Sequence, residues 1–149
     1  MNVEKIMTSE PACCSRDDDL RRVAGLMVEH DCGEIPVCDD DRKPIGVVTD
    51  RDVTCRLVAK GTNPVGMKAR DCMSSPVVTV TPGTAIEDAS RLMEQYQLRR
   101  LPVVDDDGRI CGMVAQADLA KKAPQQIAIE VVQKVSEPNV MASGAGGIR

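Results

Sequence analysis

The 149-residue sequence predicts a mixed α/β (α+β) fold built from two copies of one small β-α-β-β-α unit. The first observation is a repeat, because a shift of 66 residues lays the first half of the chain on the second half without a gap. The second is a hydrophobic pattern that changes, in each half, from helical spacing to short apolar runs. Matching positions include Met7 and Met73, Ser9 and Ser75, Leu26 and Leu92, Pro36 and Pro102, Gly46 and Gly112, Val48 and Val114, and Asp52 and Asp118.

The first unit is predicted to cover residues 1–62. A short helical lead ends at Met7, and a short strand follows at 12–15. An amphipathic helix is predicted next, because apolar residues recur at helical spacing from Leu20 to Val28 after an acidic turn. Two strands, at 34–38 and 44–49, are joined by a polar turn, which is typical of a hairpin, and a second helix carries Val53 and Leu57.

The second unit is predicted to cover residues 67–122 in the same order. Its lead ends at Met73, its short strand lies around 77–81, its helix has apolar positions from Ile86 to Tyr96, its hairpin strands cover 100–104 and 109–115, and its closing helix carries Leu119. Residues 60–66 have the composition of a linker, and a C-terminal helix is predicted for 124–135. The tail 136–149, rich in Gly, Ala and Ser, is predicted to be disordered.

The composition argues against several classes of protein. Hydrophobic residues make up 42% of the chain, enough for a core, but aromatic residues make up 1%, so aromatic platforms for stacking on nucleic-acid bases are absent. A net charge of −4 argues against a protein held by phosphate backbones. Since no apolar run is long enough to span a bilayer and the N-terminus does not resemble a signal peptide, we expect a cytoplasmic protein with no nucleic-acid and no membrane partner.

The candidate functional motif is the stretch 46–53, where an apolar run predicted as a strand leads into the start of a helix. Thr49 falls at the N-cap and Asp52 near the third helical position. Two interpretations remain open. Thr-x-x-Asp is close to a capping box, in which both side chains satisfy backbone N–H groups. The same turn can also hold a nucleotide, with phosphate on the amides and hydroxyl and ribose on the carboxylate.

The doubled motifs carry a family resemblance. Met-Thr-x-x-Pro occurs near the start of the first half and the shorter Met-Ser-x-Pro near the start of the second, and a helix, Ile/Leu-Pro-Val-x-Asp and Gly-φ-Val-x-x-x-Asp follow in register in both halves. Together they resemble the tandem CBS domain pair, or Bateman module, over roughly residues 3–122, and the chain is similar to small stand-alone CBS-pair proteins. The resemblance implies two units packed sheet to sheet with pseudo-twofold symmetry, and two clefts that commonly bind adenosine nucleotides.

The resemblance also implies site residues. In the first cleft Asp52 would accept hydrogen bonds from the ribose hydroxyls, and Thr49 would lie toward the phosphate. Arg99 and Arg100 of the other unit would contact that phosphate, with a solvated strand start as the alternative interpretation of these two arginines.

The second cleft is expected to be weak or empty. Asp118 keeps the ribose carboxylate, but Ala115 stands where the first unit has its hydroxyl residue. The residues expected to face this turn from the first unit, Gly33 and Glu34, would place a carboxylate near the phosphate, and like charges repel.

Seven cysteines with no Cys-x-x-Cys pair, together with the single His30, do not predict a metal site. Most thiols are expected to be reduced and buried. For Cys13 and Cys38 a disulfide or redox-sensitive pair is a further hypothesis, since the family topology brings their strands together. The acidic triplets at 39–41 and 105–107 favour turn hydrogen bonding over metal binding.

These observations predict a regulatory ligand-binding module and not an enzyme, because no base and nucleophile pair is visible. We expect no required cofactor, an adenine nucleotide (AMP, ADP or ATP) as candidate ligand, and a homodimer that signals occupancy to a regulated partner protein. The alternative is a ligand-free dimerisation or interaction module with a stress or redox role.

Overall fold

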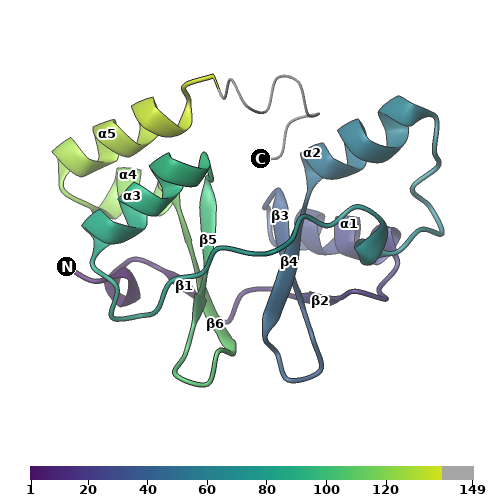
Figure 1. Ribbon diagram of the computed structural model, residues 1–149, viewed down its shortest axis with the longest axis horizontal. Helices are drawn as coiled ribbons and strands as arrows, with labels where there is room; N and C mark the ends of the chain where they lie inside the picture. The colour runs from purple at the N-terminus through teal and green to yellow at the C-terminus, as the bar shows by residue number, and fades with distance from the viewer. Residues whose placement is uncertain (139–149) are drawn as a thin grey trace. The chain divides into compact units, whose positions relative to one another are not determined.

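The computed structural model describes residues 1–138, so most of the predicted tail, 139–149, lies outside the described residues. Within the described range the chain forms a mixed α+β fold with two three-stranded sheets and the helices α1 to α5, which confirms the predicted fold class (Figure 1). The chain divides into two compact units. Within the described residues, unit 1 contains 1–11 and 78–138, which include most of the second sequence repeat, and unit 2 contains 12–77, which include most of the first.

Unit 2 has a sheet in the order β2-β3-β4, in which β2 is parallel to β3 and β3 is antiparallel to β4. Its elements are β2 (Cys14–Ser15), α1 (Leu20–Glu29), β3 (Glu34–Cys38), β4 (Pro44–Thr49) and the short α2 (Asp50–Asp52). Helix α1 begins where the Asp19 carboxylate accepts a hydrogen bond from the Arg21 backbone N–H at 2.7 Å, as expected at an N-cap.

The predicted second helix of the first repeat is not regular. After α2 the chain forms a π-helical turn at Val53–Leu57 and a 3-10 turn at Val58–Lys60. The β-branched Val53 and Thr54 have a reduced helix preference at this point. Gly61, with φ of 77°, ends the segment in the left-handed conformation that glycine adopts without strain.

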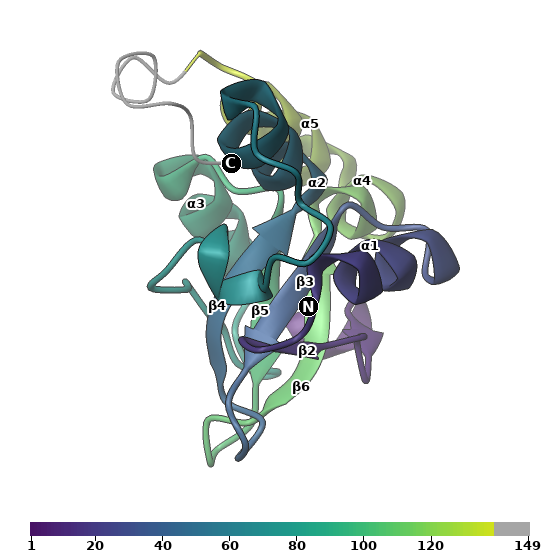
Figure 2. The same cartoon turned by 90° about the vertical axis from the view of Figure 1, so that its right-hand side faces the viewer.

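Unit 1 has an antiparallel sheet in the order β1-β6-β5. Its elements are β1 (Thr8–Ser9), α3 (Ile86–Tyr96), β5 (Arg100–Val104), β6 (Ile110–Ala115), α4 (Gln116–Lys122) and α5 (Gln125–Val135). The strand predicted around 77–81 is reduced to a single bridge between Val80 and Val103. Helices α4 and α5 lie side by side (Figure 2), and α5 buries Ala128, Val131 and Val135.

The two hairpins confirm the predicted role of the acidic triplets. The Asp39 carboxylate accepts hydrogen bonds from the backbone N–H groups of Asp41 and Lys43, both at 2.9 Å. One repeat later, the Asp105 carboxylate accepts from Asp107 and Arg109 at 2.9 and 3.0 Å. These side chains therefore stabilise the turns.

The compact units differ from the sequence repeats because the first segment of each repeat packs on the other repeat. We call these segments, residues 1–11 and 67–77, the first and second leads. The first lead joins unit 1, where the Val3 N–H donates to the Thr84 carbonyl at 2.9 Å and β1 pairs with β6. The second lead joins unit 2, where the Leu20 N–H donates to the Met67 carbonyl at 2.8 Å. The repeats 1–62 and 67–122 thus exchange their leads.

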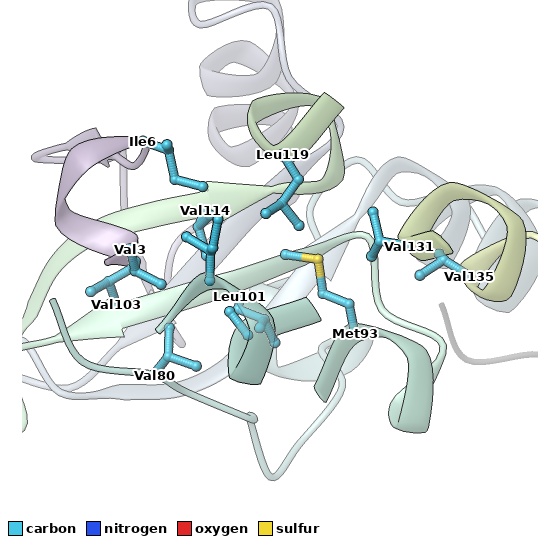
Figure 3. Packing of buried hydrophobic residues seen from close by; sticks show 12 residues of the cluster. Val3, Ile6, Val80, Met93, Leu101, Val103, Val114, Leu119, Val131 and Val135 are labelled. Atoms are coloured by element: carbon cyan, nitrogen blue, oxygen red, sulfur yellow. The ribbon is translucent and has the colours of Figure 1, made fainter. Parts of the chain in front are cut away.

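Each hydrophobic core reflects this exchange. Figure 3 shows Val3 and Ile6 of the first lead among core residues of β5, β6 and α4, including Leu101, Val114 and Leu119. The core of unit 2 likewise contains Ala69 and Cys72 of the second lead. The leads are therefore part of the packed interior of the units.

Glycines lie where the leads pass over the sheets. A Cβ added at Gly46 would meet the Ser74 carbonyl oxygen at 2.7 Å and the Met73 sulfur at 3.2 Å. At the matching Gly112 it would meet the Met7 sulfur at 2.5 Å and the Thr8 carbonyl oxygen at 3.2 Å. The duplicated glycine thus allows close backbone approach in both units.

Candidate functional site

The turn at Thr49–Asp52 connects the end of β4 to α2 in unit 2 (Figure 1). The Thr49 hydroxyl oxygen accepts a hydrogen bond from the Asp52 N–H at 3.0 Å, and the Asp52 Oδ2 accepts from the Thr49 N–H at 2.9 Å. The two side chains therefore form the capping box that the sequence left as one of two interpretations. Thr49 and Asp52 are 6% and 2% exposed, so this is a buried polar turn.

The second oxygen of Asp52 faces a cation. Its Oδ1 lies 3.6 Å from Nε of Arg56, which also donates from Nη1 to the carbonyl oxygens of Cys72 and Met73 at 3.2 and 3.4 Å. A carboxylate has about four lone-pair sites on its two oxygens, so these contacts leave acceptor capacity on Asp52.

The matching turn in unit 1 connects β6 to α4. The Ala115 N–H donates to Oδ2 of Asp118 at 2.8 Å, which reproduces one half of the capping box. Alanine has no side-chain acceptor, so the other half is missing. Asp118 is half-buried, in contrast to the nearly inaccessible Asp52.

Arg99 and Arg100 lie beside the Asp118 turn, in the same unit. The Gln116 N–H donates to the Arg99 carbonyl at 2.9 Å, and Arg100 pairs with Ala115 across the β5–β6 ladder. Arg99 is exposed and Arg100 is half-buried, and neither is in an ion pair with another residue of the described part of the chain.

The corresponding residues of unit 2 have the opposite charge. Glu34 pairs with Thr49 across the β3–β4 ladder, and the Asp50 N–H donates to the Gly33 carbonyl at 3.0 Å. The turn that carries Asp52 therefore has the carboxylates of Glu34 and Asp50 beside it, with Arg56 as its cation, whereas the turn that carries Asp118 has two arginines beside it.

Cys13 and Cys38 are in contact within unit 2. Strand alternation places them on one face of the sheet, because Ser15 pairs with Cys38 and Cys14 with Val37. A hydrogen bond between the two thiols lowers the pKa of Cys13, against the opposing effect of its burial. The same hydrogen bond raises the pKa of Cys38, and burial of that thiol raises it further. Neither cysteine is in a disulfide in the structure.

A comparison with family models decides the family. The model described as the CBS domain matches the chain twice, at residues 3–59 and 69–124. The chain belongs to the CBS domain family. It is a CBS pair, and such pairs are regulatory modules. Each match begins in one lead and ends near the end of the same sequence repeat. A CBS sequence repeat therefore differs from the corresponding compact unit only in which lead it includes.

Similar CBS-pair proteins cover nearly the whole chain. Hypoxic response protein 1 of Mycobacterium tuberculosis is 31% identical over 138 residues, which are 93% of this chain and 96% of that protein. A crystal structure of Hypoxic Response Protein I with two coordinated zinc ions has a TM-score of 0.76 and 31% identity, and covers 83% of this chain and 100% of that one. A crystal structure of CBSX2 in complex with AMP has a TM-score of 0.70 and 29% identity, and covers 82% and 95%.

Neither a metal cluster nor a membrane helix is found in the described part of this CBS pair. Among residues 1–138, no group of three or more His, Cys, Asp or Glu side chains is placed to hold a metal ion. Over the same range no helix is both long and apolar enough to cross a bilayer. His30 is the C-cap residue of α1, and its backbone N–H donates to the Leu26 carbonyl at 3.0 Å.

Sequence reasoning missed Arg56 and Lys122. These two residues fall on each other under the 66-residue shift, and each contacts a lead, since the Lys122 ammonium donates to the Ile6 carbonyl at 3.2 Å. The repeat contained the signal for both. The two positions share a positive charge but not the same residue, so a comparison of identical residues between the repeats does not pick them out.

Proposed function

We propose that this CBS pair binds an adenosine nucleotide of the AMP, ADP or ATP class at Asp52 and signals its occupancy to a partner protein. Asp52 carries the proposal. It is a carboxylate that is 2% exposed, with Oδ2 engaged in the cap and Oδ1 facing the Arg56 cation at 3.6 Å. Ribose hydroxyls are donors that such an acceptor fits. The AMP complex of the similar CBSX2 supports this class of ligand.

Arg99 and Arg100 are the proposed phosphate ligands. The turn in unit 2 has three carboxylates, those of Glu34, Asp50 and Asp52, and Arg56 already faces Asp52, so additional cations would favour the binding of a phosphate. Two adjacent arginines that form no ion pair within residues 1–138 meet this need, because guanidinium groups bind phosphate through paired N–H donors. Asp118 is the matching candidate for a second and weaker ligand.

Calorimetric titration with AMP, ADP, ATP and S-adenosylmethionine tests the function. We expect a nucleotide to bind the wild type and Asp52→Ala to abolish its binding. Thr49→Ala is expected to weaken binding less, because one hydroxyl contact contributes less than a carboxylate that bridges two ribose hydroxyls. Asp118→Ala removes the matching cap bond in unit 1 and is expected to affect only the second, weaker ligand. The absence of heat with every ligand contradicts the proposal, and equal losses for Thr49→Ala and Asp52→Ala contradict the assigned roles.

The phosphate contact is tested with adenosine, which lacks the phosphate. Arg99→Ala and Arg100→Ala are expected to weaken AMP binding while leaving adenosine binding unchanged. If both ligands lose affinity equally, the arginines act on the fold and not on the phosphate.

We also propose a homodimer as the signalling form, and light scattering coupled to size-exclusion chromatography reports the mass that tests it.

A second candidate function is a redox module, which the contact between the Cys13 and Cys38 thiols favours. In this scheme the Cys13 thiolate attacks a hydroperoxide, ROOH, giving a sulfenic acid and ROH after protonation of the leaving oxygen. The Cys38 thiol then attacks the sulfenic sulfur, and a disulfide and one water molecule form. No nucleotide is needed for this activity.

Mass spectrometry without reductant distinguishes the redox function. Treatment with hydroperoxide is expected to join the two peptides that carry Cys13 and Cys38, with the loss of two hydrogen atoms. Cys55→Ser is the matched control and is expected to react as the wild type does, whereas Cys13→Ser is expected to form no link. Free thiols at both positions after treatment contradict this function.

A further inference from the structure

The two leads are fastened by the same kind of contact. Arg56 donates to the carbonyls of Cys72 and Met73, and Lys122 donates to the carbonyl of Ile6. Ile6 and Cys72 match under the 66-residue shift, as do Arg56 and Lys122. In each unit, a cation after the polar turn therefore holds one carbonyl of the lead at an equivalent position.

Only the contact in unit 2 is connected to a candidate ligand carboxylate. Arg56 lies 3.6 Å from Asp52, which in turn accepts the Thr49 N–H, so three groups link the turn to the second lead. In unit 1, Lys122 has no ion pair with Asp118, as far as the described residues extend. The side chains differ in a way that explains this, because arginine presents donors in several directions and lysine presents one nitrogen.

The local backbone also differs between the two cations. Arg56 lies in the π-helical turn Val53–Leu57, whereas Lys122 ends the regular helix α4. Single π-helical turns are often found at functional sites. The side chain of Arg56 is 27% exposed and that of Asp52 is 3% exposed, so their contact is largely shielded from water.

The second lead is the route by which the chain leaves unit 2. Ala69 and Cys72 are in the core, the Ser74 N–H donates to the Val47 carbonyl at 2.9 Å, and the chain passes to unit 1 after Val77. A change in the contacts of Cys72 and Met73 therefore acts on the segment that precedes this passage.

We propose that Arg56 is a coupling residue that transmits the state of the Asp52 carboxylate to the lead segment 72–77. This inference rests on the proposed function for its ligand. Hydroxyl groups that donate to Oδ1 of Asp52 compete with Arg56 for the same negative charge, so ligand binding weakens the ion pair and changes how firmly Arg56 holds the two carbonyls. By linkage, the hold of Arg56 on the lead alters the affinity for the ligand by the same factor.

The first arm of the test uses ligand-free protein and amide hydrogen exchange. Asp52→Asn is expected to speed exchange in peptides that cover 72–77, by roughly 3-fold or more, a typical coupling between linked groups. The matched Asp118→Asn is expected to leave the first lead unchanged, because no ion pair joins Asp118 to Lys122. Both Arg56→Met and Lys122→Met are expected to speed exchange in their own leads.

The conservative variant Arg56→Lys gives unit 2 the lysine contact of unit 1. It is expected to keep slow exchange at 72–77 and to remove the effect of Asp52→Asn on that segment. If Asp52→Asn leaves 72–77 unchanged in the wild type, or has its full effect in the Arg56→Lys background, Arg56 does not couple the two sites. Thermal unfolding of each variant shows whether it remains folded.

The second arm adds AMP. The wild type is expected to change exchange at 72–77 on binding, whereas Arg56→Lys is expected to bind AMP, as measured by calorimetry, without that change. If the wild type gives no heat with AMP, ADP or ATP, the proposed function is wrong, and the ligand-free arm still decides the coupling. If Arg56→Lys binds AMP and shows the full wild-type change, the coupling proposal is wrong.

Discussion

Asp52 shows how one residue combines a structural and a candidate ligand-binding role. Its carboxylate completes the capping box, which typically contributes about 1 kcal/mol. Its other oxygen offsets the charge of Arg56. Removing it leaves a partly buried guanidinium without its carboxylate, so Asp52→Ala is expected to destabilise unit 2 as well as to abolish binding. Binding measurements on this variant therefore need thermal unfolding of the same variant as a folding control.

The buried thiols Cys14 and Cys72 predict a loss of stability at alkaline pH. Burial raises the pKa of Cys14 to about 12 and that of Cys72 to about 11, from an ordinary value of 9.0. Above that ordinary value the unfolded chain releases these protons while the folded chain keeps them. The stabilisation is thus complete below pH 9.0 and is lost as the pH rises toward the folded values.

Urea unfolding at two pH values measures this effect. Between about pH 8 and about pH 10, each thiol is expected to lower the free energy of unfolding by about 1 kcal/mol. Cys14→Ala is expected to show a smaller decline than the wild type. An equal decline for Cys14→Ala would mean that this thiol does not contribute.

The contact of each lead with its sheet depends on a glycine. At Gly46 an added Cβ meets a backbone oxygen at 2.7 Å, which cannot move without shifting the second lead. At Gly112 the nearest atom is the flexible Met7 sulfur. Gly46→Ala is therefore expected to destabilise the protein by about 2 kcal/mol or more and Gly112→Ala by less, since overpacking costs most where the backbone has to yield.

Gly25 provides the control for these substitutions. It lies within α1, with no atom within 4 Å of an added Cβ. Gly25→Ala is expected to stabilise the protein by roughly 0.5–1 kcal/mol, because alanine has the higher helix propensity. Thermal or denaturant unfolding measures all three variants, and a larger loss for Gly112→Ala than for Gly46→Ala would contradict the interpretation of the contacts.

Regular elements could be predicted from the sequence more closely than irregular ones. Strands β3, β4 and β5 have the predicted bounds, because hairpin strands with apolar runs and Asp-rich turns are specified locally. The π-helical turn at Val53–Leu57 was not predicted, since its apolar residues are also compatible with a regular helix. The position of Arg56 in that turn, and hence its contact with Asp52, could not be derived without coordinates.

At the scale of the whole molecule, the repeat itself was predictable but the exchange of leads was not. Two nearly equivalent copies offer each lead two nearly equivalent docking surfaces, and the residue pattern of a lead is compatible with both. The structure shows that each lead docks on the other copy. For the candidate site, the ligand-binding roles of the two turns and of the arginines stay predictions, and the position of Arg99 and Arg100 beside the Asp118 turn required the β5–β6 register.

The exchange predicts which fragments of the chain fold. A fragment of residues 12–77 contains unit 2 with its lead, including the core residues Ala69 and Cys72. A fragment of residues 1–62 contains one sequence repeat but lacks that lead. We expect cooperative unfolding, followed by circular dichroism, for 12–77 and not for 1–62. A chain of about 60 residues buries little surface, so the loss of a lead is expected to be decisive. A cooperative transition for 1–62 alone would contradict this prediction.

The exchanged leads also bear on how such a protein can arise. A chain with one repeat would have no second copy within reach, so two chains would have to trade leads to complete their cores. Such an ancestor would be an obligate swapped dimer, and its concentration would set the folded fraction. Fusion of two genes in tandem, through a short linker such as 60–66, makes the exchange of leads intramolecular, so that the folded fraction no longer depends on protein concentration.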